Sequence, residues 1–208
     1  MLPRHSPMLA ATGSAVRELD RAQWRFEPKL DGWRALAYVE DGQVTIRTRT
    51  GRDITGSVPE LAQAPARLRR RDAILDGELT VGGGGATDFY RLGPRLARRG
   101  QRASMNCPVT FFAFDVVWLD GASTCDLSYA QRRRLLEGLR MDGGCWRTVD
   151  SYDTDPLDLL VACDQLDIEG VVAKRLDSRY APGQRSPAWV KVKTPTWRDR
   201  HAPRRHDR

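Results

Sequence analysis

Short runs that alternate polar and apolar residues recur along this chain, and they limit the fold to one rich in β-strands. WRALAYVE (33–40) and QVTIRTRT (43–50) are two such runs, and Asp41-Gly42 between them is typical of a hairpin turn. Further runs that favour strands span residues 24–29, 73–81, 109–119, 168–176 and 188–193. The chain therefore contains several strands joined by turns.

Helical segments are fewer than strands. The predicted helices are Glu60–Arg71, which contains Pro65; Phe89–Arg99, interrupted at Gly93-Pro94; a helix capped by Ser128 that ends at Leu139; and a helix from Asp155 or Pro156 to about Leu166. Strands that alternate irregularly with helices indicate an α+β fold with a largely antiparallel sheet.

The charge of the chain favours a polyanionic partner. A formal net charge of +7 and a pI near 9.6 are compatible with binding to nucleic acid. Part of the excess is local, because residues 194–208 carry five arginines against two aspartates. We expect one domain over residues 1–194 and a basic, mobile tail over 195–208. The arginines of the tail are either solvated or in contact with nucleic acid.

Neither a signal peptide nor a membrane segment is recognisable in the sequence. The first twenty residues lack a charged region followed by an apolar one. No apolar run approaches the ~18 residues of a membrane span. We therefore expect a cytoplasmic protein without a membrane partner, and nothing in the sequence demands more than a monomer.

Lysine is rare in this chain, since only four of its 34 basic residues are lysines: Lys29, Lys174, Lys191 and Lys193. A lysine amine that loses its proton can attack a phosphate, whereas arginine stays protonated because its pKa lies above ~12. Lys29 lies in EPKLDGWR (27–34), where Gly32 permits close approach of the backbone to a nucleotide. An ordinary exposed lysine on a strand is the competing interpretation of this short motif.

Acidic residues and lysines also share strand faces. Asp76 and Glu78 point to one side of a strand, which a ribose hydroxyl, a metal or a basic neighbour would explain. Glu169 precedes a buried strand and is either solvated or a Mg²⁺ ligand. Lys191 and Lys193 lie ~7 Å apart on one face, where they either bind a triphosphate or face solvent.

Taken together, these segments resemble the adenylation (nucleotidyltransferase) domain of ATP-dependent DNA ligases, particularly the bacterial end-joining type. The matching segments follow the order of the family: PMLA (7–10), EPKLDGWR (27–34), RTRTGRDIT (47–55), LDGEL (75–79), Phe89, FFAFDVVWLDG (111–121), EGVVAKR (169–175) and WVKVK (189–193). The resemblance implies an ATP-grasp-like fold of two mainly antiparallel sheets with flanking helices.

The resemblance also implies a role for each matching residue. Lys29 is the catalytic nucleophile that becomes adenylylated. The ATP-binding residues are Glu27 and Phe114 at adenine, Arg34 and Glu78 at the ribose, Lys191 and Lys193 at the phosphates, and Lys174, which lines the same pocket. Arg49 contacts the 5′-phosphate of a nick, while Glu169 and Asp31 bind Mg²⁺ or Mn²⁺. From the sequence alone, an aromatic residue of the core is the better interpretation of Phe114.

The implied activity is that of an ATP-dependent DNA ligase in repair and recombination. Lys29 forms lysyl-AMP, the AMP passes to a 5′-phosphate of nicked or broken DNA, and the strand is joined. Ligases of this family normally carry a C-terminal OB-fold, which we do not expect here because the chain ends at residue 208. The alternatives are a nucleotide- or DNA-binding remnant without ligation, or an adenylyltransferase subunit that needs an OB-fold or end-joining partner. RNA joining stays open.

Overall fold

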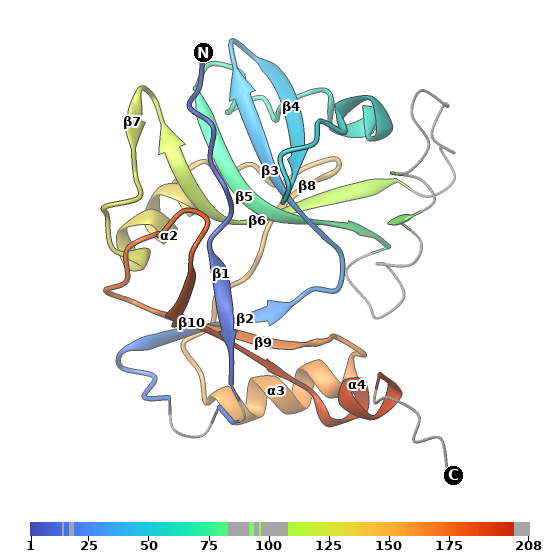
Figure 1. The fold of residues 1–208 in the computed structure, drawn as a ribbon, viewed down its shortest axis with the longest axis vertical. Helices are drawn as coiled ribbons and strands as arrows, with labels where there is room; N and C mark the ends of the chain where they lie inside the picture. Colours follow the sequence, from blue (N-terminus) through green and yellow to red (C-terminus); the bar gives the residue numbers. More distant parts are fainter. Residues whose placement is uncertain (14, 17–18, 83–91, 94–95, 97–107, 202–208) are drawn as a thin grey trace.

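The computed structural model describes residues 1–201 except 14, 17–18, 83–91, 94–95 and 97–107. Within these residues, the strands form two sheets (Figure 1). The four-stranded sheet has the order β1 (Leu9–Thr12), β10 (Arg185–Lys193), β9 (Gly170–Arg175) and β2 (Trp24–Lys29). The six-stranded sheet has the order β4 (Gln43–Thr48), β3 (Trp33–Glu40), β5 (Ala73–Val81), β6 (Val109–Leu119) and β7 (Ala122–Ser123), and β8 (Trp146–Thr148) also pairs with β6.

Most strand pairs are antiparallel, which confirms the predicted α+β fold of two mainly antiparallel sheets. The parallel pairs in the described part of the chain are β1 with β10 and β6 with β8. The predicted hairpin joins β3 to β4, and its two turn residues, Asp41 and Gly42, have φ values of 49° and 75°. Both values are positive, as a tight turn that matches the strand twist requires.

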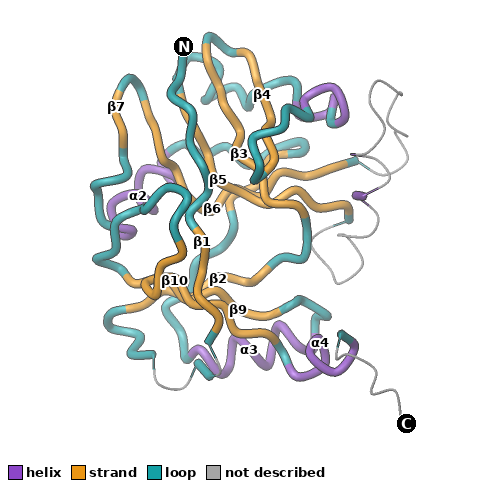
Figure 2. The backbone as a smooth tube through the Cα atoms, in the orientation of Figure 1, coloured by secondary structure: helices purple, strands orange, loops and turns teal. Residues whose placement is uncertain are grey.

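Helices flank the sheets (Figure 2). Helix α2 (Tyr129–Gly138) begins with a capping box in which Ser128 and Gln131 bond to each other's backbone N–H. Asp155 caps α3 (Pro156–Gln165), so both predicted helices of the C-terminal half are confirmed. Helix α3 packs against β9 and β2 of the four-stranded sheet, and α4 (Pro195–Arg200) packs against α3.

The predicted helix over 60–71 is wrong. The 3₁₀ turns η1 (Thr55–Ser57) and η2 (Pro59–Leu61) are followed by irregular turns. Pro65 has no backbone N–H to continue a helix, and its carbonyl accepts bonds from Leu68 and Arg69. Most of the predicted helix 89–99 lies outside the described residues, as does Phe89.

The predicted mobile tail also differs from the structure in its first residues. Helix α4 occupies six of them, and Thr194 caps it by accepting a bond from the backbone of Trp197. Residues 202–208 of the tail lie outside the described part of the chain. The described residues contain no helix long and apolar enough to cross a membrane.

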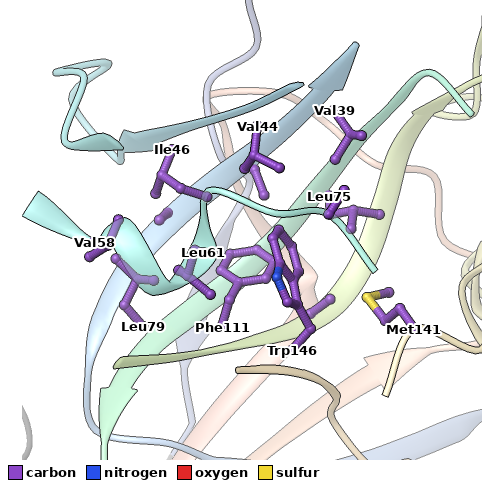
Figure 3. Packing of buried hydrophobic residues seen from close by; sticks show 14 of the residues in the cluster. Val39, Val44, Ile46, Val58, Leu61, Leu75, Leu79, Phe111, Met141 and Trp146 are labelled. Carbon is purple, nitrogen blue, oxygen red and sulfur yellow. The ribbon is translucent and has the colours of Figure 1, made fainter. Parts of the chain in front are cut away.

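The main core lies on one face of the six-stranded sheet, beneath η2 and the turns after it (Figure 3). Phe111 and Trp146 meet edge to face there, with ring centroids 5.3 Å apart, a geometry that contributes about 0.5–1.5 kcal/mol beyond burial. Leu75 and Leu79 of β5 point into this core. Because side chains alternate along a strand, Asp76 and Glu78 point to the opposite face.

A second cluster of buried residues joins the two sheets. Ile74 and Val117 from the six-stranded sheet pack there with Met8, Tyr180 and Trp189. This cluster fixes the polar face of β5 opposite β10, which is where the candidate site lies.

Candidate active site

A cavity of ≈ 210 Å³ lies between the two sheets and gathers most of the residues predicted from the sequence. Those predicted residues are Glu27, Lys29, Arg34, Arg49, Glu78, Phe114, Lys174 and Lys191. The rest of the lining consists of Leu9, Ala10, Pro28, Leu30, Val149, Val172, Arg185 and Trp189. The chain therefore brings segments separated by more than a hundred residues to one cavity.

Strand register explains why the lysines meet. Lys29 of β2 and Lys193 of β10 both pair with Gly170, one on each side of β9. Two residues further along β9, Val172 pairs with Glu27 on one side and Lys191 on the other. Residues paired across strands share a face of the sheet, so the alternation noted in the sequence places these charges on one surface.

The amine of Lys29 lies against a carboxylate. Its Nζ contacts Glu169, whose other oxygen lies 3.0 Å from Nζ of Lys193. The side chain of Glu169 is only 4% exposed, whereas that of Lys29 is 21% exposed. Glu169 is thus neither solvated nor free, because two lysines hold its two oxygens. An attack by Lys29 on a phosphate requires this ion pair to open.

The two predicted metal ligands lie near each other. The pKa of Asp31 is raised by burial and then by the charge of Glu169, while Lys29 partly opposes this shift. Among the described residues, no group of three or more His, Cys, Asp or Glu side chains could hold a metal. Mg²⁺ is commonly held by one or two carboxylates together with substrate phosphates. Asp31 and Glu169 are two carboxylates of this kind, and both oxygens of Glu169 are paired with lysines in this structure.

Glu27 is the centre of a buried hydrogen-bonded group. Its Oε1 accepts a 2.5 Å bond from the Tyr129 hydroxyl, and its Oε2 lies 2.7 Å from Nζ of Lys174. Lys174 also donates to the Phe114 carbonyl at 3.0 Å. Burial lowers the pKa of Lys174, and Glu27 opposes that shift. The ammonium of Lys174 is therefore committed to protein groups, and unlike Lys29 and Lys193 this lysine is fully buried.

Phe114 satisfies both interpretations of its sequence position. Its ring packs partly buried against the cluster between the sheets, edge to face with Trp189 at 6.2 Å. It also lines the cavity, where the guanidinium of Arg34 lies 4.3 Å and the ammonium of Lys174 4.4 Å from the ring centroid. Such contacts between cations and an aromatic face are attractive and fix the ring in place.

Asp76 is explained by a basic neighbour, one of the three possibilities raised by the sequence. Arg34 donates two bonds of 2.6 Å to its carboxylate, and the Tyr180 hydroxyl donates a third at 2.6 Å. Arg34 also donates to the carbonyl of Met8 at 3.1 Å. The guanidinium is thereby held at the wall of the cavity. Arg34 is paired with Glu78 on the adjacent strand, so the two side chains are neighbours on one face of the sheet.

Glu78 differs from Asp76 in its environment. Burial raises its pKa to about 7, although Lys29 and Arg34 act in the opposite direction. A carboxylate that is only partly ionised near neutral pH can either accept a hydrogen bond from a hydroxyl group or donate one to it.

Arg49 is exposed at the edge of the cavity and makes no ion pair with a described residue.

Lys191 points into the cavity without a carboxylate partner among the described residues. Its pKa is lowered by burial and then by the positive charges of Lys29, Lys193 and Arg185. Several cations with few counter-charges constitute a site that an anion stabilises.

Three aromatic residues of the site were not predicted from the sequence: Tyr129, Tyr180 and Trp189. Trp189 carried a usable signal, because it precedes Lys191 and Lys193 at the two-residue spacing of one strand face. The hydroxyls of Tyr129 and Tyr180 reach carboxylates 102 and 104 residues away in sequence. No local pattern indicates such partners.

Comparison with known proteins gives consistent matches. A family model described as ATP dependent DNA ligase domain matches residues 7–193. The multifunctional non-homologous end joining protein LigD of Mycolicibacterium smegmatis is 38% identical over 189 residues, which cover 90% of this chain and 24% of that protein. DNA ligase 1 of Korarchaeum cryptofilum is 35% identical and is covered to 36%. The chain thus spans about a quarter to a third of these relatives.

Solved structures resemble the fold as well. A mycobacterial DNA ligase D complexed with ATP and MES aligns with a TM-score of 0.77 and 35% identity, over 91% of this chain and 60% of that one. The ligase domain of LigD from M. tuberculosis aligns with a TM-score of 0.75 and 35% identity, over 91% of this chain and 59% of that one.

Proposed function

This chain belongs to the ATP-dependent DNA ligase domain family, and from that premise we propose that it forms lysyl-AMP at Lys29 and passes the AMP to a 5′-phosphate of DNA. The observation that carries the proposal is the convergence of Lys29, Lys191 and the Glu27–Lys174 pair on one cavity between the sheets. Three of the four lysines of an arginine-rich chain line this cavity, and two of them, Lys29 and Lys191, are not committed to Glu27 as Lys174 is.

The first step joins an amine to a phosphate. The nitrogen of Lys29 loses a proton and attacks the α-phosphorus of ATP, an N–P bond forms, and the bond to the bridging oxygen of pyrophosphate breaks. Lys191 and Lys193 neutralise the charge that develops on the leaving pyrophosphate. Mg²⁺ or Mn²⁺, held by Glu169 and Asp31 with the phosphates, would supply further charge neutralisation.

The remaining residues orient the nucleoside. Phe114 offers a ring face to adenine, and Glu27 lies beside it in an orientation fixed by Tyr129 and Lys174. Arg34 and Glu78, on adjacent strands, face the ribose. Because the bonds that Arg34 donates to Asp76 hold the guanidinium in place before ATP binds, little side-chain entropy is lost on binding.

The later steps concern DNA. Arg49, exposed at the rim of the cavity, would bind the 5′-phosphate that receives AMP, and the 3′-hydroxyl would then displace AMP to join the strand. The relative in M. smegmatis is named as an end-joining protein, which supports a role in DNA repair and recombination. We place this activity in the cytoplasm, in a monomer that acts on nicked or broken DNA.

The test is transfer of label from α-labelled ATP to the protein in the presence of Mg²⁺ or Mn²⁺. We expect a labelled band with the wild type and none with Lys29→Arg, because a guanidinium keeps the charge but cannot attack. Arg21→Gln, which changes an exposed residue outside the cavity, serves as the control that keeps the label. No labelling at any ATP or metal concentration, with ATP binding intact, would contradict the proposal. Nicked duplexes of DNA and RNA then define the joining step.

A further inference from the structure

A second basic surface lies away from the cavity, on the segment where a helix was predicted and turns are found. A hollow of ≈ 510 Å³ is lined by Ala66, Arg67, Arg69, Arg70, Arg71, Gly138 and Leu139. Four arginines thus line one hollow from five consecutive positions. We call it the arginine hollow, and the proposed chemistry at Lys29 makes no use of it.

The backbone of the arginine hollow is fixed. Leu68, between the arginines, is fully buried in the main core. Backbone bonds run from Leu68 and Arg69 to the carbonyl of Pro65, and from Arg71 to the carbonyl of Leu68. These bonds hold the backbone of the four arginines in a tight series of turns.

Few carboxylates neutralise these arginines. Arg71 pairs with Asp120 at 2.6 Å, and Arg69 donates through Nε to the carbonyl of Ala64 at 3.1 Å. Arg67 and Arg70 are exposed and make no ion pair with a described residue. Guanidinium groups with free forked donors and a fixed backbone suit the oxygens of phosphate groups.

The hollow is separate from the active site. Arg71 lies two residues before β5, at the end of the strand opposite to Glu78. The five steps from Ala73 to Glu78 span about 17 Å at ~3.3 Å per residue. The arginine hollow also lies over the core face of the six-stranded sheet, because Leu68 packs in the main core, whereas Glu78 points to the opposite face.

From this arrangement we infer that the arginine hollow is a second binding site for the phosphate backbone of duplex DNA, remote from the reacting nick. The choice of DNA over another polyanion rests on the proposed function. The contact is independent of base sequence, because guanidinium groups on phosphates carry no base information. It adds affinity for the duplex without taking part in lysyl-AMP formation.

The test compares two double variants of the full 208-residue chain. Arg67→Gln with Arg70→Gln removes the two unpaired arginines of the hollow. Arg21→Gln with Arg179→Gln removes two exposed arginines elsewhere, and the ion pair of Arg179 with Asp126 is long, at 3.7 Å, and exposed. Both variants change the net charge equally. Affinity for a fluorescein-labelled nicked duplex is measured by anisotropy over a series of salt concentrations.

The slope of log K against log salt is negative, and each lost phosphate contact reduces its magnitude by about 0.9. We expect the variant Arg67→Gln with Arg70→Gln, the hollow variant, to reduce the magnitude of the slope by about 2 and to bind the duplex several-fold more weakly. The control variant should keep the slope of the wild type. Labelling of Lys29 by ATP without DNA should be unchanged in both. Thermal unfolding confirms that both variants are folded.

Two results would overturn the inference. One is a salt slope of the hollow variant that equals that of the wild type. If this variant then binds polyglutamate more weakly than the wild type does, the hollow is a site for an acidic protein. The other is an equal loss of slope in both variants. A slope difference in protein that fails to label with AMP would support the hollow and contradict the proposed function, so the two failures are distinguishable.

Discussion

Glu78 is a carboxylate whose proton affinity depends on its place in the fold. Burial raises its pKa from the ordinary 4.5 to about 7. Between these values the folded protein keeps a proton that the unfolded chain releases, so the free energy of unfolding falls as pH rises. Glu78→Gln removes this fall in stability, because glutamine does not titrate. We expect the Tm of the variant minus the Tm of the wild type to increase by a few degrees from pH 5 to pH 8.

The measurement is thermal unfolding of both proteins across this pH range. Glu137→Gln is the control, because it removes a carboxylate that is 53% exposed and on the surface of α2. A Tm difference for Glu78→Gln that stays constant or shrinks towards pH 8 would show that burial does not govern the proton of this residue.

At the same scale, the sequence predicted which residues meet but not always what they contact. The resemblance to the ligase family implied that Lys29, Glu78 and Lys191 share one site, and all three line one cavity. Gly32 was interpreted as room for a nucleotide, yet a Cβ there would lie 2.1 Å from the carbonyl of Leu79. That glycine permits the close contact of β3 with β5. Its partner comes from a distant strand, which no local motif reveals.

Among the elements, β9 depends on its first residue. Gly170 lies between Lys29 and Lys193, and a Cβ there would be 2.1 Å from the carbonyl of Val192 and 2.8 Å from Cα of Lys193. Backbone atoms cannot move aside easily, so Gly170→Ala must displace β10. We expect a destabilisation of about 1–3 kcal/mol in urea unfolding, together with slower labelling of Lys29.

Gly56→Ala is the matched control, because nothing lies within 4 Å of a Cβ at that position. Its unfolding midpoint should stay close to that of the wild type. If Gly170→Ala also left the unfolding midpoint unchanged, β9 and β10 would be able to move apart without loss of stability. The spacing of Lys29 and Lys193 would then not depend on this glycine.

Strands were predicted better than helices for a physical reason. β3, β5 and β6 have eight, nine and eleven residues, most of them buried, so long apolar runs revealed their bounds in the sequence. β1 and β8 have four and three residues, too few for a pattern. The segment 60–71 has helix-forming residues, but Pro65 and the burial of Leu61 and Leu68 against the sheet favour turns.

For the whole molecule, the important relation is between the two sheets. They are joined by the apolar cluster around Trp189 and by polar contacts such as that of Lys174 with the Phe114 carbonyl. The cavity between them has Glu78 and Phe114 on one side and Lys29 and Lys191 on the other. A nucleotide that contacts both sides therefore stabilises the molecule as a unit, in proportion to its binding free energy.

A variant at Lys191 separates the contribution of the phosphates to the binding free energy from that of the adenosine. We use an ATP analogue with a non-cleavable α,β-methylene link, so that Lys29 does not react. At a hundred times its Kd, a ligand adds about 2.7 kcal/mol, or roughly 5–10 °C in Tm for a chain of this size. A charged hydrogen bond contributes about 1.5–3 kcal/mol, so Lys191→Met should abolish much of the shift given by the analogue.

The same variant should leave the shift given by adenosine unchanged, because Lys191 lies among the other cations and not beside Phe114 or Glu27. Without ligand, Lys191→Met should be as stable as the wild type or slightly more so, since burial and neighbouring positive charges already lower the pKa of this lysine and no described carboxylate loses a partner. Equal losses for adenosine and the analogue would mean that the sheets have moved and that Lys191 does not act through the phosphates.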